Sequence, residues 1–186
     1  MFYRQDGPSQ WANARLVRYA DDFVVMAKYQ GYRIDEWIDA KLEGWLGLKI
    51  NREKTKVVNL DQAESLDFLG FTFRYDRDLY SGDKTYLNVM PSKKSLKKAR
   101  AAIREKTGKS KCYKPTPKVI EDLNIYLRGW SNYFEYGYPR KAFRDLSHYT
   151  RNRMVTHLNR RSQRKYHRLK GLSHYQHLEK LGLLRL

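Results

Sequence analysis

Cysteine is nearly absent from this chain, because Cys112 is the single one among 186 residues. One cysteine excludes an internal disulfide and a cysteine-rich zinc site. The five histidines therefore lack cysteine partners, and we expect His174 and His177, spaced i, i+3, to be surface or packing residues rather than metal ligands. The sequence also has no apolar run long enough to cross a bilayer, and residues 1–6 lack the apolar centre of a secretory signal. These absences favour a cytoplasmic protein and predict no membrane partner.

Acidic residues are scarce in the second half of the sequence. Residues 1–90 hold 13 Lys and Arg against 14 Asp and Glu, whereas residues 91–186 hold 25 against 6. Dense positive charge interleaved with aromatic side chains is typical of proteins that bind nucleic acid. Attraction to an anionic membrane surface is the alternative, but the sequence shows no clean basic amphipathic helix with a wide apolar face. The charge pattern predicts two domains, residues 1–90 and residues 91–186, with a nucleic-acid partner for the second.

Two adjacent carboxylates near the N-terminus interrupt a β-prone stretch at residues 16–26. The apolar runs on either side of Asp21 and Asp22 predict a tight hairpin with both acids at or beside its turn. Neighbouring carboxylates repel each other, but a hard cation such as Mg²⁺ between them and a phosphate makes the arrangement favourable. Asp is also a common turn residue, so a solvated turn without metal is the alternative. The tetrapeptide Tyr19-Ala20-Asp21-Asp22 resembles the metal-binding turn of reverse transcriptases.

The rest of the first half predicts strands around one helix. Residues 34–45 place apolar side chains at helical spacing, and we expect the aromatic ones, Trp37 and Trp45, to lie in a core. Gly70 interrupts a β-prone run, which indicates a bulge or a close backbone approach. Strands are expected at residues 55–60, 68–73 and 85–89, with a hairpin loop at 75–84 around Ser81-Gly82-Asp83. This pattern is typical of part of an α+β layer.

The second half is predicted to be helical. A helix begins at Pro91-Ser92 and ends before Gly108, and a basic loop follows at residues 107–118. The next helix carries an apolar stripe formed by Leu123, Tyr126, Leu127, Trp130 and Phe134. Residues 141–161 and 174–181 are expected to form two further helices. The predicted fold class is therefore α+β, with a short antiparallel sheet and one helix followed by an all-helical basic domain.

Several motifs agree in order and spacing with one family. The matching segments are the tetrapeptide at 19–22, residues 47–51 with Lys54-Thr55, residues 68–71, and Leu-Arg-Gly-Trp-Ser-Asn-Tyr-Phe at 127–134. Together they resemble the C-terminal part of a group II intron reverse transcriptase with its maturase domain, and the last element separates this family from retron and retroviral enzymes. The resemblance implies that residues 1–90 are the end of a polymerase palm. It implies that residues 91–186 are the thumb and the maturase domain, which binds intron RNA for splicing and mobility.

The resemblance also implies a site for RNA-directed DNA synthesis. Asp21 would be a direct ligand of the catalytic Mg²⁺, and Asp22 would support or share the metal site. Tyr19 and Ala20 would lie near the primer terminus and the incoming deoxynucleoside triphosphate. Lys54 would approach the triphosphate and stabilise or protonate the leaving pyrophosphate, and a solvated lysine before a strand is an equal alternative. The element that grips the DNA primer opposite the RNA template corresponds to Phe68, Leu69 and Gly70, and a core position for Phe68 is an equal alternative.

Parts that this family requires do not occur in the sequence. A further palm Asp and the fingers should precede the metal-binding turn by a long segment, whereas only residues 1–14 precede it here. We therefore expect a piece of a larger enzyme, or a chain whose missing portion another chain supplies, and no polymerase activity from this polypeptide alone. The zinc-containing DNA endonuclease of some relatives is also missing. The alternative function is a non-catalytic RNA-binding splicing module that retains a palm remnant.

Basic and aromatic residues of the second half are the candidate contacts to RNA. Arg and Lys can neutralise phosphates, and exposed Tyr faces can stack on unpaired bases. The candidates are Lys93, Lys94, Lys97, Lys98, Lys109, Lys111, Arg128, Tyr136, Tyr138, Arg151, Arg160, Arg161 and Arg164. Trp130 and Phe134 lie on the apolar stripe and are expected to be core residues instead.

Overall fold

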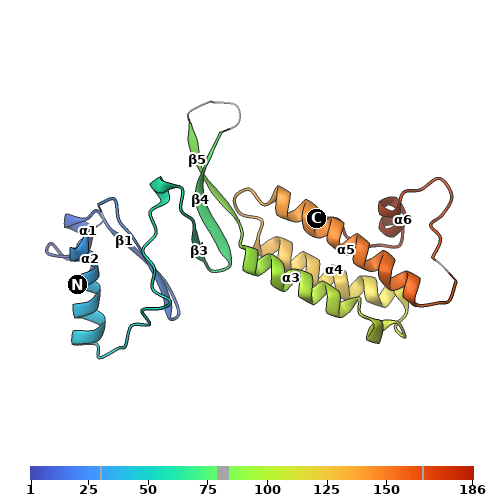
Figure 1. Ribbon diagram of the computed structural model, residues 1–186, viewed down its shortest axis with the longest axis horizontal. Helices are drawn as coiled ribbons and strands as arrows, with labels where there is room; N and C mark the ends of the chain where they lie inside the picture. Colours follow the sequence, from blue (N-terminus) through green and yellow to red (C-terminus); the bar gives the residue numbers. More distant parts are fainter. Residues whose placement is uncertain (30, 79–83, 165) are drawn as a thin grey trace. The chain divides into compact units, whose positions relative to one another are not determined.

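The computed structural model describes residues 1–29, 31–78, 84–164 and 166–186. These ranges contain six α-helices, a two-stranded antiparallel sheet and a three-stranded antiparallel sheet, so the α+β fold class is confirmed. The chain divides into two compact units, Met1–Val57, called unit 1, and Val58–Leu186, called unit 2 (Figure 1).

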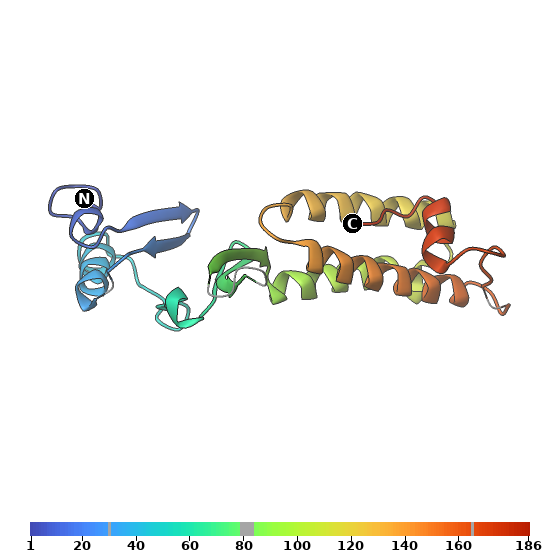
Figure 2. The same ribbon diagram turned by 90° about the horizontal axis from the view of Figure 1, so that it is seen from above.

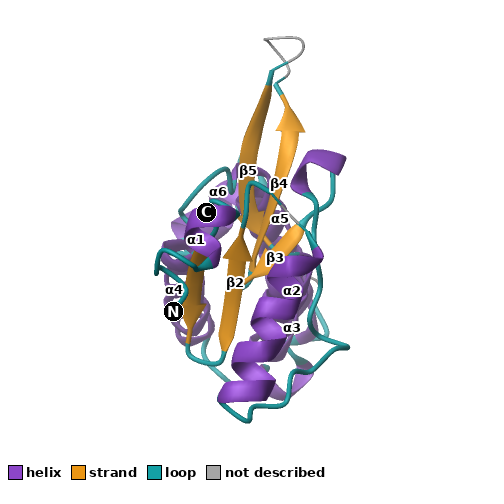
Figure 3. Cartoon of the chain, turned by 90° about the vertical axis from the view of Figure 1, so that its left-hand side faces the viewer, coloured by secondary structure: helices purple, strands orange, loops and turns teal. Residues whose placement is uncertain are grey.

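Unit 1 is built on a hairpin and a helix. Its elements are α1 Pro8–Trp11, β1 Arg15–Tyr19, β2 Asp22–Met26, α2 Tyr32–Asp39 and a π-helical turn, η1, at Ala40–Trp45. Leu16 and Val25 face each other across the two strands and pack with Trp37 against a small core that includes Phe2 and Ile34. The hairpin and α2 therefore share one apolar layer, and α2 lies beside β2 in the ribbon (Figure 3).

The predicted helix at residues 34–45 is present, but its second half has π geometry. A π-helix has a wider turn than an α-helix, so the 3.6-residue spacing no longer keeps side chains on one face beyond Asp39. Trp37 lies against the core as expected. The expectation that Trp45 lies in the core is wrong, because its side chain is 63% exposed.

The strand expected at residues 55–60 is also wrong. Residues 55–59 are irregular and are followed by a short 3-10 helix, η2, at Leu60–Gln62. The Asn59 side chain accepts a hydrogen bond from the Asp61 amide and so opens this helix. A β-prone segment forms a strand only beside a partner, and within the described ranges no strand pairs with residues 55–60.

The sheet of unit 2 has the order β3-β4-β5, with β3 at Leu66–Phe68, β4 at Phe71–Arg77 and β5 at Thr85–Pro91. The single strand predicted at residues 68–73 is wrong, because Leu69 and Gly70 form a two-residue turn between β3 and β4. Both turn residues have positive φ angles, 50° and 84°, as a type I′ hairpin requires. The predicted returning strand at 85–89 is confirmed. β4 continues to Arg77, so the loop is shorter than expected, and Ser81-Gly82-Asp83 lies outside the described residues.

Three long helices run alongside one another in unit 2 (Figure 2). They are α3 Lys93–Lys106, α4 Thr116–Tyr133 and α5 Arg140–Arg160, and the short helices η3 Lys109–Lys111 and α6 His174–Lys180 complete the unit. The expected helices are thus confirmed, and the Ser92 side chain caps α3 by accepting from the Ser95 amide. No helix in the described ranges is both long enough and apolar enough to span a bilayer.

The core of unit 2 lies between these helices. Leu123, Leu127, Leu146 and Met154 are fully buried, and each such side chain contributes about 1.5–3 kcal/mol relative to an exposed one. The predicted stripe on α4 is confirmed, since Trp130 and Phe134 are 8% and 5% exposed.

Helix α6 and the C-terminal residues 181–186 pack against the core of unit 2. Leu178 and Leu183 are buried in it. The Asn124 side chain donates to the Gly182 carbonyl and accepts from the Leu184 amide, which fastens the tail to α4.

The boundary between the two units lies at residues 57 and 58, upstream of residue 91, where the charge changes. The sheet β3-β4-β5 belongs to unit 2 because its turn packs against the helices. The sequence-based division at residue 91 follows charge rather than packing, and the assignment of residues 1–90 to a polymerase palm stays a prediction.

Candidate nucleic-acid interface

The acidic turn is formed as the sequence predicts. Tyr19 pairs with Asp22 across the hairpin, and Ala20 and Asp21 are the two turn residues between them. Ala20 has a φ of 50°, and its carbonyl accepts a 2.8 Å hydrogen bond from Arg18 Nε. Asp21 and Asp22 are exposed, and in the described part of the chain their carboxylates make no hydrogen bond or ion pair. Two consecutive residues at the tip of a hairpin therefore carry unpaired, exposed carboxylates.

The carboxylate oxygens at this turn are suitable ligands for a hard cation, but only two carboxylates are present at the turn. Carboxylate oxygens are the ligands that Mg²⁺ prefers, and this ion normally keeps several waters or phosphate oxygens as its other ligands. Within the described ranges, no group of three or more His, Cys, Asp or Glu side chains is placed to hold a metal ion. Asp21 and Asp22 would thus supply two ligands, and water, phosphate or further carboxylates would supply the others.

Lys54 follows a turn that Asn51 organises. The Asn51 side chain accepts a hydrogen bond from the Lys54 amide, and the Asn51 carbonyl accepts one from the Thr55 hydroxyl. The Lys54 side chain is exposed, and no ion pair joins it to the acidic turn among the described residues. The structure therefore leaves both interpretations of Lys54 open.

The residues predicted to grip a primer form the tight turn between β3 and β4, which packs against two helices. The Gly70 carbonyl accepts hydrogen bonds from the Ser92 amide at 2.8 Å and the Ser95 hydroxyl at 2.9 Å. The Leu69 carbonyl accepts a 2.8 Å hydrogen bond from the Tyr133 hydroxyl. The close approach expected at Gly70 is confirmed, since a Cβ atom there would lie 2.9 Å from Ser95 Oγ. The turn is thus part of the packing of unit 2, and primer contact by Phe68, Leu69 and Gly70 stays a prediction.

The predicted RNA contacts lie on several elements of unit 2, and most are exposed. Lys93, Lys94, Lys97 and Lys98 are exposed on α3, Lys109 on η3, Arg128 on α4, and Arg160, Arg161 and Arg164 at the end of α5 and beyond, whereas Lys111 is half-buried. Tyr136 and Tyr138 are 69% and 59% exposed, as expected for residues that could stack on bases. Arg161 is partly engaged, because its guanidinium donates to the Thr116 hydroxyl.

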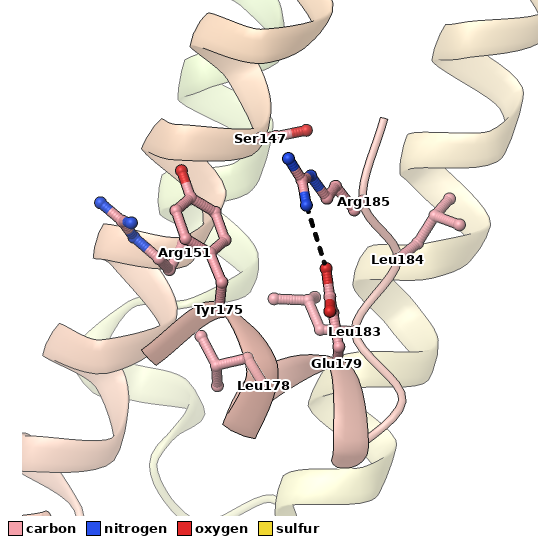
Figure 4. Close-up of a pocket in the computed structure, with 8 residues that line it drawn as sticks. All are labelled: Ser147, Arg151, Tyr175, Leu178, Glu179, Leu183, Leu184 and Arg185. Atoms are coloured by element: carbon pink, nitrogen blue, oxygen red, sulfur yellow. Dashed lines mark ion pairs between the residues drawn. The ribbon is translucent and has the colours of Figure 1, made fainter. Parts of the chain in front are cut away.

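Arg151 is less free than the other predicted contacts. Its guanidinium lies 3.9 Å from the centre of the Tyr175 ring, and Arg185 lies 5.6 Å from the same ring. These residues line a small pocket between α5, α6 and the tail, where Arg185 also pairs with Glu179 at 3.7 Å (Figure 4). Arg151 therefore helps to hold α6 on α5.

The predicted RNA contacts omit two exposed basic residues of α3, Arg100 and Arg104. Lys93, Lys97, Arg100 and Arg104 are exposed and recur at intervals of four, three and four residues, so they share one face of the helix. Arg100 lies 5.9 Å from the Tyr149 ring on α5. The same i, i+4, i+7 spacing that identified the apolar stripes would have identified this basic one.

Few of these cations are neutralised within the protein. In the described part of unit 2, ion pairs join Arg74 to Asp76, Lys114 to Asp122, Lys118 to Glu121 and Arg185 to Glu179. The 2.8 Å hydrogen bond between Lys114 and Asp122 raises the pKa of Lys114 and lowers the pKa of Asp122, so both stay charged. The exposed cations of α3 and of the end of α5 have no acidic partner among the described residues. A surface of unpaired cations is electrostatically complementary to an external polyanion.

His157 lies near several of these cations, but its own side chain is not positively charged. It is fully buried on α5, and neither ring nitrogen has a hydrogen-bond partner in the described part of the chain. Burial is the largest effect and lowers the pKa of His157, the Thr107 backbone acts in the opposite direction, and the nearby Arg161, Arg153 and Arg160 lower the pKa further. The ring is therefore neutral and belongs to the packing of α5.

Residues 96–175 match the model of a known family, described as the group II intron, maturase-specific domain. The match covers less than half of the chain, and the matched segment is similar to a group II intron maturase-specific domain. The domain extends from Leu96 on α3 to Tyr175 on α6 and contains the core of unit 2. The match confirms the resemblance to the C-terminal part of a group II intron maturase. A search of curated proteins gave no match.

All the predicted RNA contacts except Lys93 and Lys94 fall inside the maturase-specific domain. The acidic turn, Lys54 and the Leu69-Gly70 turn fall outside it. The family match therefore applies to the basic helical part of the chain.

Proposed function

We propose that the maturase-specific domain binds group II intron RNA and assists its splicing, with the exposed cations of unit 2 as contacts to the RNA backbone. The observation that carries this proposal is the set of exposed cations on α3 and at the end of α5, which have no acidic partner among the described residues. Phosphates of a folded RNA would supply the missing negative charge, and release of their counterions would drive binding.

The arrangement on α3 and beside Gly137 supports two kinds of contact. The stripe Lys93, Lys97, Arg100 and Arg104 covers about 16 Å of helix, long enough to follow an RNA strand. Tyr136 and Tyr138 present exposed rings on which unpaired bases could stack. Structured RNA offers both a phosphate track and unpaired loops.

The test is to neutralise three unpaired cations of the stripe, Lys93→Gln, Lys97→Gln and Arg104→Gln, in the 186-residue chain. Binding to group II intron RNA is measured by fluorescence anisotropy at several salt concentrations. Each lost phosphate contact should lower the slope of log K against log salt by about 0.7–0.9, so the triple variant should lose about 2 units of slope.

The control variant removes the same net charge from cations that already have acidic partners, with Arg74→Gln, Lys118→Gln and Arg185→Gln. Its salt slope should stay near that of the wild type. Equal losses in the two triples would mean that only net charge matters. The absence of salt-dependent binding by the wild-type chain would overturn the proposal.

We further propose that the acidic turn belongs to a Mg²⁺-dependent, RNA-directed DNA polymerase site in the complete enzyme. Support comes from Asp21 and Asp22, which are exposed and unpaired on a turn whose first residue, Ala20, has positive φ. Such backbone strain clusters at functional sites. A bound Mg²⁺ would neutralise charge on the transferring phosphoryl group, and the two carboxylates would hold the ion beside the primer terminus.

Under this proposal the complete enzyme uses an RNA template, a DNA primer and deoxynucleoside triphosphates. Tyr19 and Ala20 would border the nucleotide, and Lys54 would approach its triphosphate. The alternative is a splicing module that binds RNA without polymerase activity. Asp21→Ala in the complete enzyme distinguishes the two, because only a polymerase requires this carboxylate for DNA synthesis, while RNA binding should stay near the wild-type value under both.

A further inference from the structure

The segment between Asp145 and Glu179 contains no acidic residue. It holds eight Lys and Arg and all five histidines of the chain. It covers most of α5, the loop at residues 161–173, described except at residue 165 and called the α5–α6 loop, and the start of α6. The positive charge of this loop therefore has no acidic neighbour along the chain.

One buried side chain fixes the middle of the α5–α6 loop. His177 on α6 is 7% exposed, and its Nδ1 atom accepts a 3.3 Å hydrogen bond from the Leu169 amide. Because a backbone amide can only donate, Nδ1 carries no proton, and the Tyr166 hydroxyl at 2.7 Å also donates to it. The two rings stack with their centres 5.5 Å apart. The Nδ1 atom of His177 thus accepts hydrogen bonds from two residues of the loop, Tyr166 and Leu169.

Further hydrogen bonds fix the ends of the loop. The Tyr166 amide donates to the Asn159 side chain at 3.0 Å, and the Leu172 amide donates to the Leu169 carbonyl at 3.2 Å. The Arg161 guanidinium donates to Thr116 on α4. Most of the backbone is therefore ordered by contacts that leave the cationic side chains outside.

Four exposed cations in or directly before the α5–α6 loop indicate what this loop binds. Arg160, Arg164, Arg168 and Lys170 are exposed, and their side chains make no ion pair or hydrogen bond in the described part of the chain. Leu169 is the one apolar side chain of the loop that is more than half exposed among its described residues, which is little for a membrane-binding surface. Unpaired cations on an ordered backbone suit the phosphates of RNA.

We propose that the α5–α6 loop is a preformed binding surface for the RNA backbone and that His177 is the positioning residue that holds it. This inference rests on the proposed RNA-binding function. A loop that is ordered before binding loses little conformational freedom in the complex, so affinity depends on the contacts that order it. His177 contributes without touching RNA.

The test replaces the acceptor and keeps an aromatic ring, with His177→Phe in the 186-residue chain. Affinity for group II intron RNA should fall by about threefold to tenfold, because the loop must be ordered on binding. The amide of Leu169 should exchange with solvent much faster, and helical unfolding followed by circular dichroism should stay near that of the wild type. Tyr166→Phe removes one donor and keeps the ring, and should give a smaller loss in the same direction.

The matched control is His174→Phe, the same substitution one turn earlier on α6. The His174 ring lies 6.2 Å from the Tyr166 ring and makes no hydrogen bond in the part of the chain that the structure describes, so RNA affinity and Leu169 exchange should not change. A second arm combines His177→Phe with Arg164→Gln, Arg168→Gln and Lys170→Gln. If the loop acts through these cations, the combined loss should be smaller than the sum of the separate losses.

The outcomes separate this inference from the function on which it rests. If His177→Phe or Tyr166→Phe frees the Leu169 amide while RNA affinity stays at the wild-type value, the loop is not a binding surface and the RNA-binding function stands. If the combined variant loses the full sum of affinities, His177 acts elsewhere and the inference is wrong. If the wild-type chain shows no affinity for intron RNA, the proposed function fails and the inference fails with it.

Discussion

Ala20 has the most unusual backbone of the residues near the acids. Its φ of 50° costs an L-amino acid about 1–2 kcal/mol relative to the right-handed regions, and two-residue hairpin turns normally place Gly or Asn there. The hydrogen bond from Arg18 to the Ala20 carbonyl offsets part of that cost. The turn is thus held in one geometry, which fixes where the carboxylates of Asp21 and Asp22 begin.

We expect the acidic turn to bind divalent cations selectively. Addition of Mn²⁺ to the wild-type chain should broaden the amide NMR signals of residues 20–23 at about millimolar concentrations, because two carboxylates without further protein ligands bind weakly. The double variant Asp21→Asn, Asp22→Asn should abolish this broadening.

The chain offers an internal control for this measurement. Asp35 and Glu36 are also adjacent and exposed, but they lie on a helix rather than at a hairpin turn. Broadening of equal strength at both pairs would show ordinary surface attraction and would contradict a site at the turn.

At the scale of single residues, burial could be predicted wherever the helical period was regular. Trp130 and Phe134 were expected to be buried from their spacing, and Tyr136 and Tyr138 to be exposed from their place beside Gly137, and both expectations are confirmed. Trp45 was predicted wrongly because the π-helical turn changes the period. RNA contact by Arg151 stays a prediction, and its stacking on Tyr175 of α6 is a contact between distant segments that no local pattern reveals.

At the scale of elements, the Leu69-Gly70 turn connects the sheet of unit 2 to α3 and α4. Gly70→Ala should destabilise unit 2 by about 1–3 kcal/mol, because a Cβ atom would meet Ser95 Oγ and the φ of 84° disfavours any side chain. The measurement is urea unfolding followed by far-ultraviolet circular dichroism, which the helices of this unit dominate.

The same substitution elsewhere should have the opposite sign. Gly129 lies within α4, and a Cβ atom there would meet nothing within 4 Å, so Gly129→Ala should stabilise the unit by about 0.5–1 kcal/mol. Unchanged stability in Gly70→Ala would show that the turn tolerates a side chain, and a loss of stability in Gly129→Ala would contradict the expected gain on α4.

Elements could be predicted from the sequence where hydrophobic period or turn chemistry was complete within one segment. The hairpin around Asp21 and the stripe on α4 are of this kind. The strand expected at residues 55–60 failed because strand formation depends on a distant partner. The run at 68–73 predicts one strand rather than a hairpin, because a Leu at positive φ beside Gly70 gives no local signal of a turn.

At the scale of the whole molecule, the two units differ strongly in charge. Residues 1–57 hold 10 Lys and Arg against 8 Asp and Glu, whereas residues 58–186 hold 28 against 12. Self-repulsion should therefore weaken unit 2 at low ionic strength, and salt should screen it. Raising NaCl from about 0.02 M to about 0.3 M, over which the Debye length falls severalfold, should raise the unfolding temperature of unit 2 by several degrees.

Unit 1 provides the comparison in the same sample. Three of the four tryptophans, Trp11, Trp37 and Trp45, lie in unit 1, so tryptophan fluorescence mainly follows its unfolding while circular dichroism follows the helices of unit 2. The fluorescence transition should move much less with salt. Equal shifts in both signals would mean that repulsion among the cations of unit 2 is unimportant.

The fastening of the Leu69-Gly70 turn has a mechanical consequence. Its two carbonyls accept three hydrogen bonds, one from α4 and two from residues at the start of α3, so β3 and β4 cannot tilt without breaking these bonds or moving both helices. These hydrogen bonds therefore couple the position of the sheet to that of α3 and α4. A molecule that bound β4 and β5 and displaced them would also displace the helices that carry proposed RNA contacts.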